Sequence, residues 1–137
     1  MLASRVGAIW LGVLLLVAAA SAREAPPPLP EGARTVDMIE YCSMRRIRRM
    51  TTFYPLGAIA SRTPGDVILD CALTADNALH SCVIVDETPA GRGFGDAALA
   101  MACRYGPGLQ EHDERIYQPD GNDLRRVRWP SRFRVND

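Results

Sequence analysis

Hydrophobic and polar positions are patterned most clearly in the middle of the chain. Two runs, 67–74 and 79–86, are rich in β-branched and aliphatic residues. The segment between them contains Asp76 and Asn77, whose side chains hydrogen-bond the local backbone and tolerate left-handed conformations. The pattern predicts two antiparallel strands joined by a tight turn.

A short helix and a final strand follow this hairpin. Asp96 stands before the apolar residues of 97–105, and aspartate is a frequent helix N-cap, so this segment is predicted to be helical. The chain closes on 124–135, whose pattern predicts a strand. Pro130 lacks an amide hydrogen and therefore places this strand at the edge of a sheet.

The order strand, strand, helix, strand predicts the fold class. A right-handed crossover through the helix returns the last strand beside the first one. We therefore expect an α+β fold with a small three-stranded antiparallel sheet, order 2-1-3, and one main helix packed on one face. The opposite face of the hairpin is less polar than a solvated face, which suggests that something covers part of it.

The N-terminal region differs from this domain. An apolar run over 6–20 follows Arg5 and ends in Ala20-Ser21-Ala22, the pattern of a cleavable signal peptide. We expect 1–22 to be a signal peptide and the protein to be exported to the periplasm. A retained inner-membrane anchor is the alternative, although the run lies at the short end of the ~20 residues that span a bilayer.

Two further segments precede the domain. Residues 23–34 are rich in proline and predict a short extended tether. Residues 35–53 are predicted to form an N-terminal arm or short helix, and the domain is predicted to cover 54–137.

Four cysteines, an even number, remain after the leader, which in a small exported domain favours disulfides. A turn centred between Asp76 and Asn77 places Cys71 directly opposite Cys82, within disulfide range. Buried free thiols, or a metal site that adds His80, are the alternatives. Cys42 and Cys103 are left as a second pair by elimination.

Composition argues against several functions. The 16 arginines balance 16 acidic residues, and this charge balance does not favour a nucleic-acid partner. The glycine-rich segment 91–95 lacks the Lys-Ser/Thr ending of a phosphate-binding loop. No set of nucleophile and base is suggested, so we expect no enzymatic activity, cofactor, metal or small-molecule substrate.

The chain resembles the C-terminal domain of the TonB family over about 54–135. Tyr54-Pro55 with Ala58, followed by a glycine-led strand, is similar to the opening of that domain. A bacterial TonB-like subgroup has one cysteine in each hairpin strand, and the later motifs resemble it: Cys71, Cys82, Glu87, Pro89, Gly91, Gly93, Phe94, Gly95, Ala97, Ala98 and Leu99. The closing segment 129–133 resembles the family's last strand.

This resemblance implies a non-enzymatic module. Its expected partner is a short peptide, the TonB box, of a TonB-dependent outer-membrane receptor, bound as an added strand. The cleavable leader, the short tether and the long acidic loop 106–123 depart from a TonB that couples energy with ExbB and ExbD. That membrane-anchored transducer is therefore the alternative, and a disulfide-stabilised envelope structural protein is another.

The expected working surface is the free edge of the last strand. Arginines alternate along it and favour an acidic or carboxylate-bearing peptide, unless they only protect the edge from aggregation. The predicted peptide-binding residues are Val127, Arg128, Trp129, Ser131, Arg132, Phe133, Arg134 and Val135.

Overall fold

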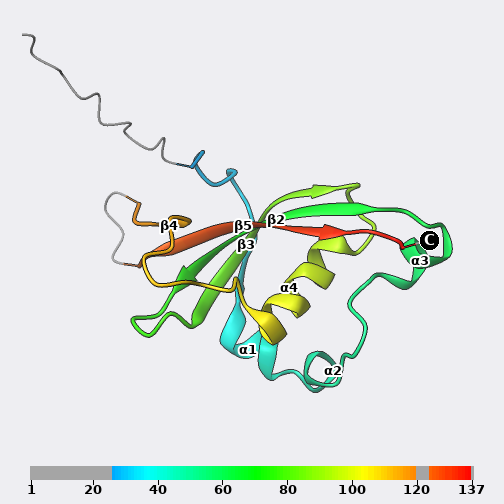
Figure 1. Cartoon of the computed structure of the whole chain (residues 1–137), viewed down its shortest axis with the longest axis horizontal. Coiled ribbons are helices and arrows are strands. Elements are labelled where there is room, and N and C mark those ends of the chain that lie inside the picture. The colour runs from blue at the N-terminus through cyan, green and yellow to red at the C-terminus, as the bar shows by residue number, and fades with distance from the viewer. Residues whose placement is uncertain (1–25, 120–123, 137) are drawn as a thin grey trace, which may run out of the picture.

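The structure is a computed structural model that describes residues 26–119 and 124–136. These residues form one antiparallel sheet of five strands in the order β1-β3-β2-β5-β4. The strands are β1 (Thr35–Asp37), β2 (Gly65–Leu73), β3 (Leu79–Thr88), β4 (Ile116–Tyr117) and β5 (Arg126–Phe133). The helices are α1 (Met38–Ser43), α2 (Arg45–Arg48), α3 (Leu56–Ala60) and α4 (Phe94–Tyr105). In Figure 1, α4, α1 and α2 all lie on the same side of the sheet.

The predicted fold class is wrong. The described residues contain five strands and four helices, instead of three strands and one main helix. The three expected strands are neighbours in the order β3-β2-β5, and β1 and β4 extend the sheet at its two sides. The added strands are three and two residues long. Segments this short carry no alternating pattern, so their pairing depends on what the rest of the fold brings beside them.

The hairpin has the predicted register at its centre, where Cys71 lies opposite Cys82. The two cysteines form a disulfide, with 4.0 Å between their Cα atoms, so this predicted bridge is confirmed. Both sulfurs are therefore used, which excludes the alternative metal site with His80. The register shifts beyond Ala72 and beyond Ile68, which marks two irregularities in the ladder.

Helix α4 covers one face of β2 and β3 with a dense apolar contact. Phe94 and Leu99 are almost fully buried in it, against Val67 and Leu69 of β2. The helix begins at Phe94, earlier than predicted, and Gly93 takes the N-cap position with a φ of 86°. Asp96 lies in the first turn instead. A positive φ is a conformation that glycine adopts without steric cost, so Gly93 allows the tight entry into α4.

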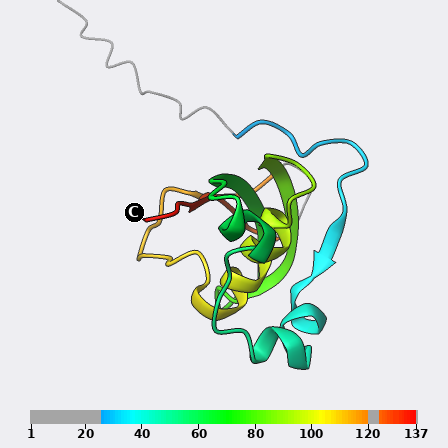
Figure 2. The ribbon, with the colours of Figure 1, turned by 90° about the vertical axis from the view of Figure 1, so that its right-hand side faces the viewer.

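The segment 35–53 is part of this packed unit. β1 pairs with β3, and Met38 of α1 and Ile47 of α2 are buried. Asp37 caps α1 by accepting hydrogen bonds from the amides of Ile39 and Glu40, at 2.9 and 3.1 Å. In Figure 2, β1 and α1 (cyan) run down one side of the molecule.

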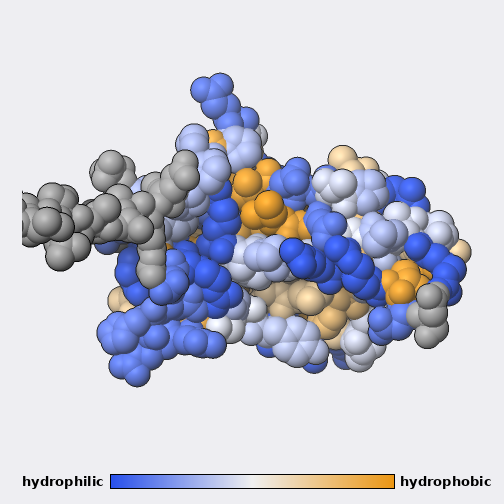
Figure 3. Space-filling model, turned by 45° about the horizontal axis from the view of Figure 1, so that its top comes forward, coloured by the Kyte–Doolittle hydropathy of each residue, from blue (hydrophilic) through white to orange (hydrophobic). Residues whose placement is uncertain are grey.

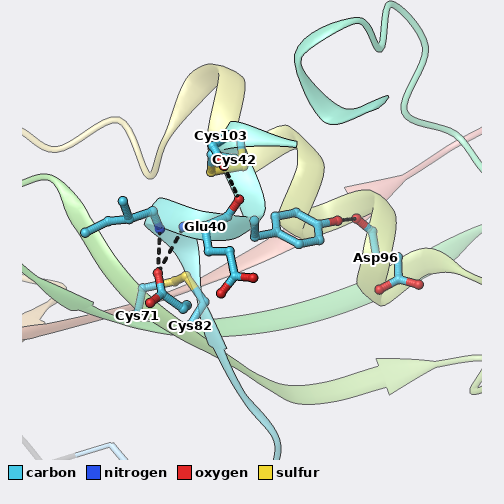
Figure 4. The surroundings of a disulfide bond; sticks show 10 residues. Glu40, Cys42, Cys71, Cys82, Asp96 and Cys103 are labelled. Atoms are coloured by element: carbon cyan, nitrogen blue, oxygen red, sulfur yellow. Dashed lines mark hydrogen bonds between the residues drawn. A yellow bond between two sulfur atoms is a disulfide. The ribbon is translucent and has the colours of Figure 1, made fainter. Parts of the chain in front are cut away.

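The second disulfide, Cys42–Cys103, joins α1 to α4 with 5.5 Å between the Cα atoms, which confirms the pairing expected by elimination. Figure 4 shows Cys71–Cys82 beside the start of α1 and Cys42–Cys103 at its end. The Tyr41 hydroxyl of α1 donates to the Asp96 carbonyl of α4 at 3.2 Å. Burial, and then the charge of Asp96, raise the pKa of Tyr41.

The predicted signal peptide, 1–22, and the first part of the tether lie outside the described residues. Among the helices of 26–119 and 124–136, none is long and apolar enough to cross a membrane.

Candidate functional site

The outer edge of β5 is defined by the alternation of its hydrogen bonds. The Leu73 amide donates to the Arg125 carbonyl at 2.8 Å, and the β2–β5 register continues without a shift. In an antiparallel ladder, every second residue directs both backbone groups to the neighbouring strand. Odd-numbered residues of β5 therefore bond to β2. The backbone groups of Arg128, Pro130 and Arg132 point away from β2, towards the outer edge.

β4 occupies the beginning of this edge. Ile116 lies opposite Val127, and Tyr117 lies opposite Arg126. No strand of the described residues pairs with the outer side of β5 from Arg128 to Phe133. The open part of the edge is therefore shorter than the sequence predicted, and Pro130 removes one donor from its middle.

The predicted edge residues form two sets, which differ in where their side chains lie. Val127, Trp129 and Phe133 are buried in the core with α4, at 0, 8 and 5% exposed. The Phe133 ring contacts the Phe94 ring, with the centroids 5.3 Å apart. These three side chains hold β5 on the core, so only their backbone lies near the edge. Ser131 shares their side of β5 but is only partly buried.

The other set lies on the opposite face or at the end of the strand. Arg128 is mostly buried and Arg132 is exposed. Arg134 follows the strand, and its guanidinium donates to the Gly65 carbonyl and to Asp66 Oδ1 at 3.1 and 2.8 Å. Val135 is partly buried beyond the end of β5.

A buried carboxylate organises this opposite face. Asp70 in the middle of β2 is fully buried. Its Oδ1 accepts from Arg126 Nε at 2.6 Å, and its Oδ2 accepts from Arg128 Nε at 2.8 Å and from the Tyr117 hydroxyl. Burial raises the pKa of Tyr117 above its usual 10.0, and the hydrogen bond to Asp70 adds to that shift. Tyr117 is thus a neutral donor at physiological pH, and the cluster ties β2, β4 and β5 together.

This Asp70 cluster also carries an excess of positive charge. Two guanidinium groups share one carboxylate, and their side chains are only 10 and 14% exposed. Arg128 Nη2 is buried and has no hydrogen-bond partner in the part of the chain that the structure describes. An unpaired donor on a buried cation is costly, because it has lost its hydration and gained nothing in return.

A groove of about 920 Å³ lies next to Arg128. It is lined by the segment 110–117 and by Pro26, Asn77, Arg125 and Arg128. Figure 3 brings forward the sheet face remote from α4, on which apolar patches are separated by hydrophilic side chains.

The loop that forms one wall of the groove is held by an ion pair. Arg115 Nε donates to Asp113 Oδ1 at 2.9 Å, and Arg115 Nη1 donates to the Pro107 carbonyl at 2.9 Å. The Arg115 guanidinium keeps the pKa of Asp113 well below its usual value. The ion pair closes a turn directly before β4 and so presents Ile116 and Tyr117 to β5.

Sequence reasoning named Arg128 as a residue of the peptide-binding edge but missed its partner Asp70, and it also missed Tyr117. The signal for Asp70 was present: it is the one charged residue of the predicted strand 67–74, and an isolated buried charge needs a partner. Tyr117 gave no such signal, because it lies in a polar loop and its partner is 47 residues away.

The arginines of α2 do not form a comparable site. Arg45, Arg46 and Arg48 are exposed, and Arg46 lies 5.8 Å from the centre of the Tyr41 ring. This cluster behaves as a solvated face with one cation–π contact.

Comparison with protein-family models, with curated proteins and with solved structures finds no match for this chain. Its resemblance to the TonB C-terminal domain therefore remains a prediction, carried by the motifs named above.

Proposed function

We propose that this protein is a non-enzymatic, TonB-like module of the cell envelope. It acts in the periplasm and binds an extended peptide of a TonB-dependent outer-membrane receptor. The peptide adds as a strand to β5, beyond the end of β4. Binding of this kind derives its affinity from main-chain hydrogen bonds and its specificity from neighbouring side chains.

The observation that carries the proposal is the open outer edge of β5. The backbone groups of Arg128 and Arg132 point outward, with Pro130 between them supplying only its carbonyl. The buried side chains of Trp129 and Phe133 anchor the strand to the core. A ligand strand therefore meets an edge that is already ordered, which reduces the entropy lost on binding.

Two disulfides support the proposed compartment. Cys42–Cys103 and Cys71–Cys82 together leave no free cysteine in the described residues. Structural disulfides of this kind persist in oxidising compartments, and the periplasm is one of them.

The proposal is tested by chemical-shift mapping of ¹⁵N-labelled protein with TonB-box peptides. The largest perturbations are expected at the amides of Arg128 and Arg132, since these point to the ligand. Arg132→Pro removes one outward donor and should weaken binding about fivefold, the value of one hydrogen bond of ~1 kcal/mol.

Arg132→Ala is the matched variant, because it removes the guanidinium and retains the amide. It should bind more tightly than Arg132→Pro. An absence of perturbation at millimolar peptide, or perturbation only at 45–49, would refute strand addition at β5. In that case the disulfide-stabilised structural protein becomes the better description.

A further inference from the structure

Arg128 occupies a special position on the open edge of β5. It is the first residue beyond β4 whose backbone groups point outward, because Val127 is the last residue that β4 covers. Its side chain lies on the face remote from α4, where its Nε is bonded to Asp70 at 2.8 Å. A strand added along the edge thus has one end beside Arg128 and the groove.

The Arg128 guanidinium has a hydrogen-bond donor that no described residue uses and that is suited to bind an anion. Its Nη2 has no partner in the described residues, while Asp70 is already shared with Arg126 and Tyr117. A guanidinium offers a fork of donors that matches the two oxygens of a carboxylate. If the Arg128 side chain turns towards the groove that it lines, a ligand carboxylate reaches this donor, satisfies it and balances the second positive charge of the cluster.

The charges around the groove restrict where such an anion sits. Arg125 adds a second positive charge to the lining, and its guanidinium donates to Asn77 Oδ1 at 2.7 Å. The loop adds Glu111, Asp113 and Glu114 to the lining, together with Arg115, which pairs with Asp113. The attractive position for a carboxylate is thus the Arg128 end, close to the β5 edge.

We propose that Arg128 binds a carboxylate of the peptide strand, so that the module selects strands with an acidic group at the β4 end of the edge. This inference rests on the proposed peptide binding and names the ligand chemistry of that site. The carboxylate is supplied either by an acidic side chain or by the C-terminus of the peptide.

The first experiment uses acetate, which probes Arg128 independently of strand addition. Acetate should shift the guanidinium resonances of Arg128, while chloride at equal ionic strength should not. The second experiment compares three peptides of otherwise identical sequence. One carries Glu with an amidated end, one carries Gln with an amidated end, and one carries Gln with a free carboxylate.

Wild-type protein should bind one carboxylate-bearing peptide at least about tenfold more tightly than the neutral peptide, as expected for a charge-assisted hydrogen bond. The peptide that gains this affinity identifies the source of the carboxylate. Arg128→Gln should abolish the difference. Arg128→Lys retains the charge towards Asp70 but loses the fork, so it should keep only part of the preference.

Arg45→Gln is the control, because Arg45 is an exposed arginine of α2 and this variant loses the same charge. It should keep the full preference for the carboxylate. Urea unfolding of each variant establishes that it is folded, and Arg128→Lys remains informative if Arg128→Gln does not fold.

The outcomes separate the two proposals. Equal binding of all three peptides, with shifts along β5, overturns the carboxylate site and leaves strand addition in place. Shifts with acetate, without binding of any peptide, overturn strand addition and support the anion site. An absence of response to both probes overturns both.

Discussion

Asp70 and Asp66 lie on the same strand and the same face, yet their surroundings differ greatly. Asp70 is fully buried and bonded to two arginines and a tyrosine. Asp66 pairs with Arg134 at 2.8 Å, and the two side chains are 54 and 51% exposed. Exposed ion pairs contribute little, because water screens them, whereas removal of one partner of a buried pair leaves a desolvated charge.

We predict that Asp70→Asn destabilises the protein by about 3–5 kcal/mol, and that Asp66→Asn costs less than about 1 kcal/mol. Asparagine has nearly the same shape as aspartate, so the difference isolates the charge. Equilibrium urea unfolding of both variants measures it. Equal, small effects would show that the Asp70 cluster is not held by its charge.

The contact between α4 and the hairpin depends on a close approach at Gly95. A Cβ atom added there would lie 2.7 Å from Ile84 Cδ1 and 2.9 Å from Glu87 Oε2. Both atoms are the ends of flexible side chains of β3, so a larger residue requires these side chains to turn aside or the helix to move. Gly93 and Gly95 belong to the motif that resembles the TonB family. Packing against β3 explains Gly95, and the backbone conformation at the start of α4 explains Gly93.

We predict that Gly95→Ala destabilises the protein by about 1 kcal/mol, the lower end of the usual cost of overpacking, because the contacted side-chain ends can partly give way. Gly57→Ala is the control in α3, where an added Cβ meets nothing within 4 Å. Alanine is the better helix former, so this control should stabilise by about 0.5–1 kcal/mol. Thermal unfolding of both variants tests the contrast, and a neutral Gly95→Ala would contradict the close approach.

The prediction that the last strand lies at the edge of the sheet holds for only part of that strand. Pro130 predicts that β5 lies at the edge of the sheet, and its ring nitrogen does face away from β2. β4 nevertheless pairs with Arg126 and Val127. A strand of two residues can form there because the Tyr117 hydroxyl reaches Asp70 of β2, on the far side of β5, which no local pattern reveals.

At the scale of the whole molecule, the two disulfides close loops of very different length. Cys71 and Cys82 are separated by 11 positions, and Cys42 and Cys103 are separated by 61. In the chain-entropy account, a bridge that closes a longer loop restricts the unfolded chain more. Cys42–Cys103 is also the covalent link between the N-terminal segment and α4.

We predict that replacing Cys42 and Cys103 by alanine costs about 4 kcal/mol, and that replacing Cys71 and Cys82 costs about 3 kcal/mol from loop closure. The first variant should also show faster hydrogen exchange in α1 and α2 than in β2 and β3, because only the N-terminal segment loses its tether. Hydrogen exchange that accelerates equally in all elements would contradict this local effect.

The sequence by itself determined the features that rest on near neighbours in the chain. The Asp76–Asn77 turn and the alternation beside it sufficed to place Cys71 opposite Cys82, because hairpin register is set within a few residues. The residue types of 97–105 similarly indicated the main helix, although its first turn at Phe94 depends on a tight contact with β3.

Only the tertiary structure decided what surrounds these elements. The partners of Asp70 are 47, 56 and 58 residues away, and β1 finds its place beside β3, which lies far from it in sequence. Pairing of this kind depends on which backbone groups remain unsatisfied once the core has formed, and that is a property of the assembled fold. The same assembly decides which part of the β5 edge stays open and leaves Arg128 with an unused donor beside it.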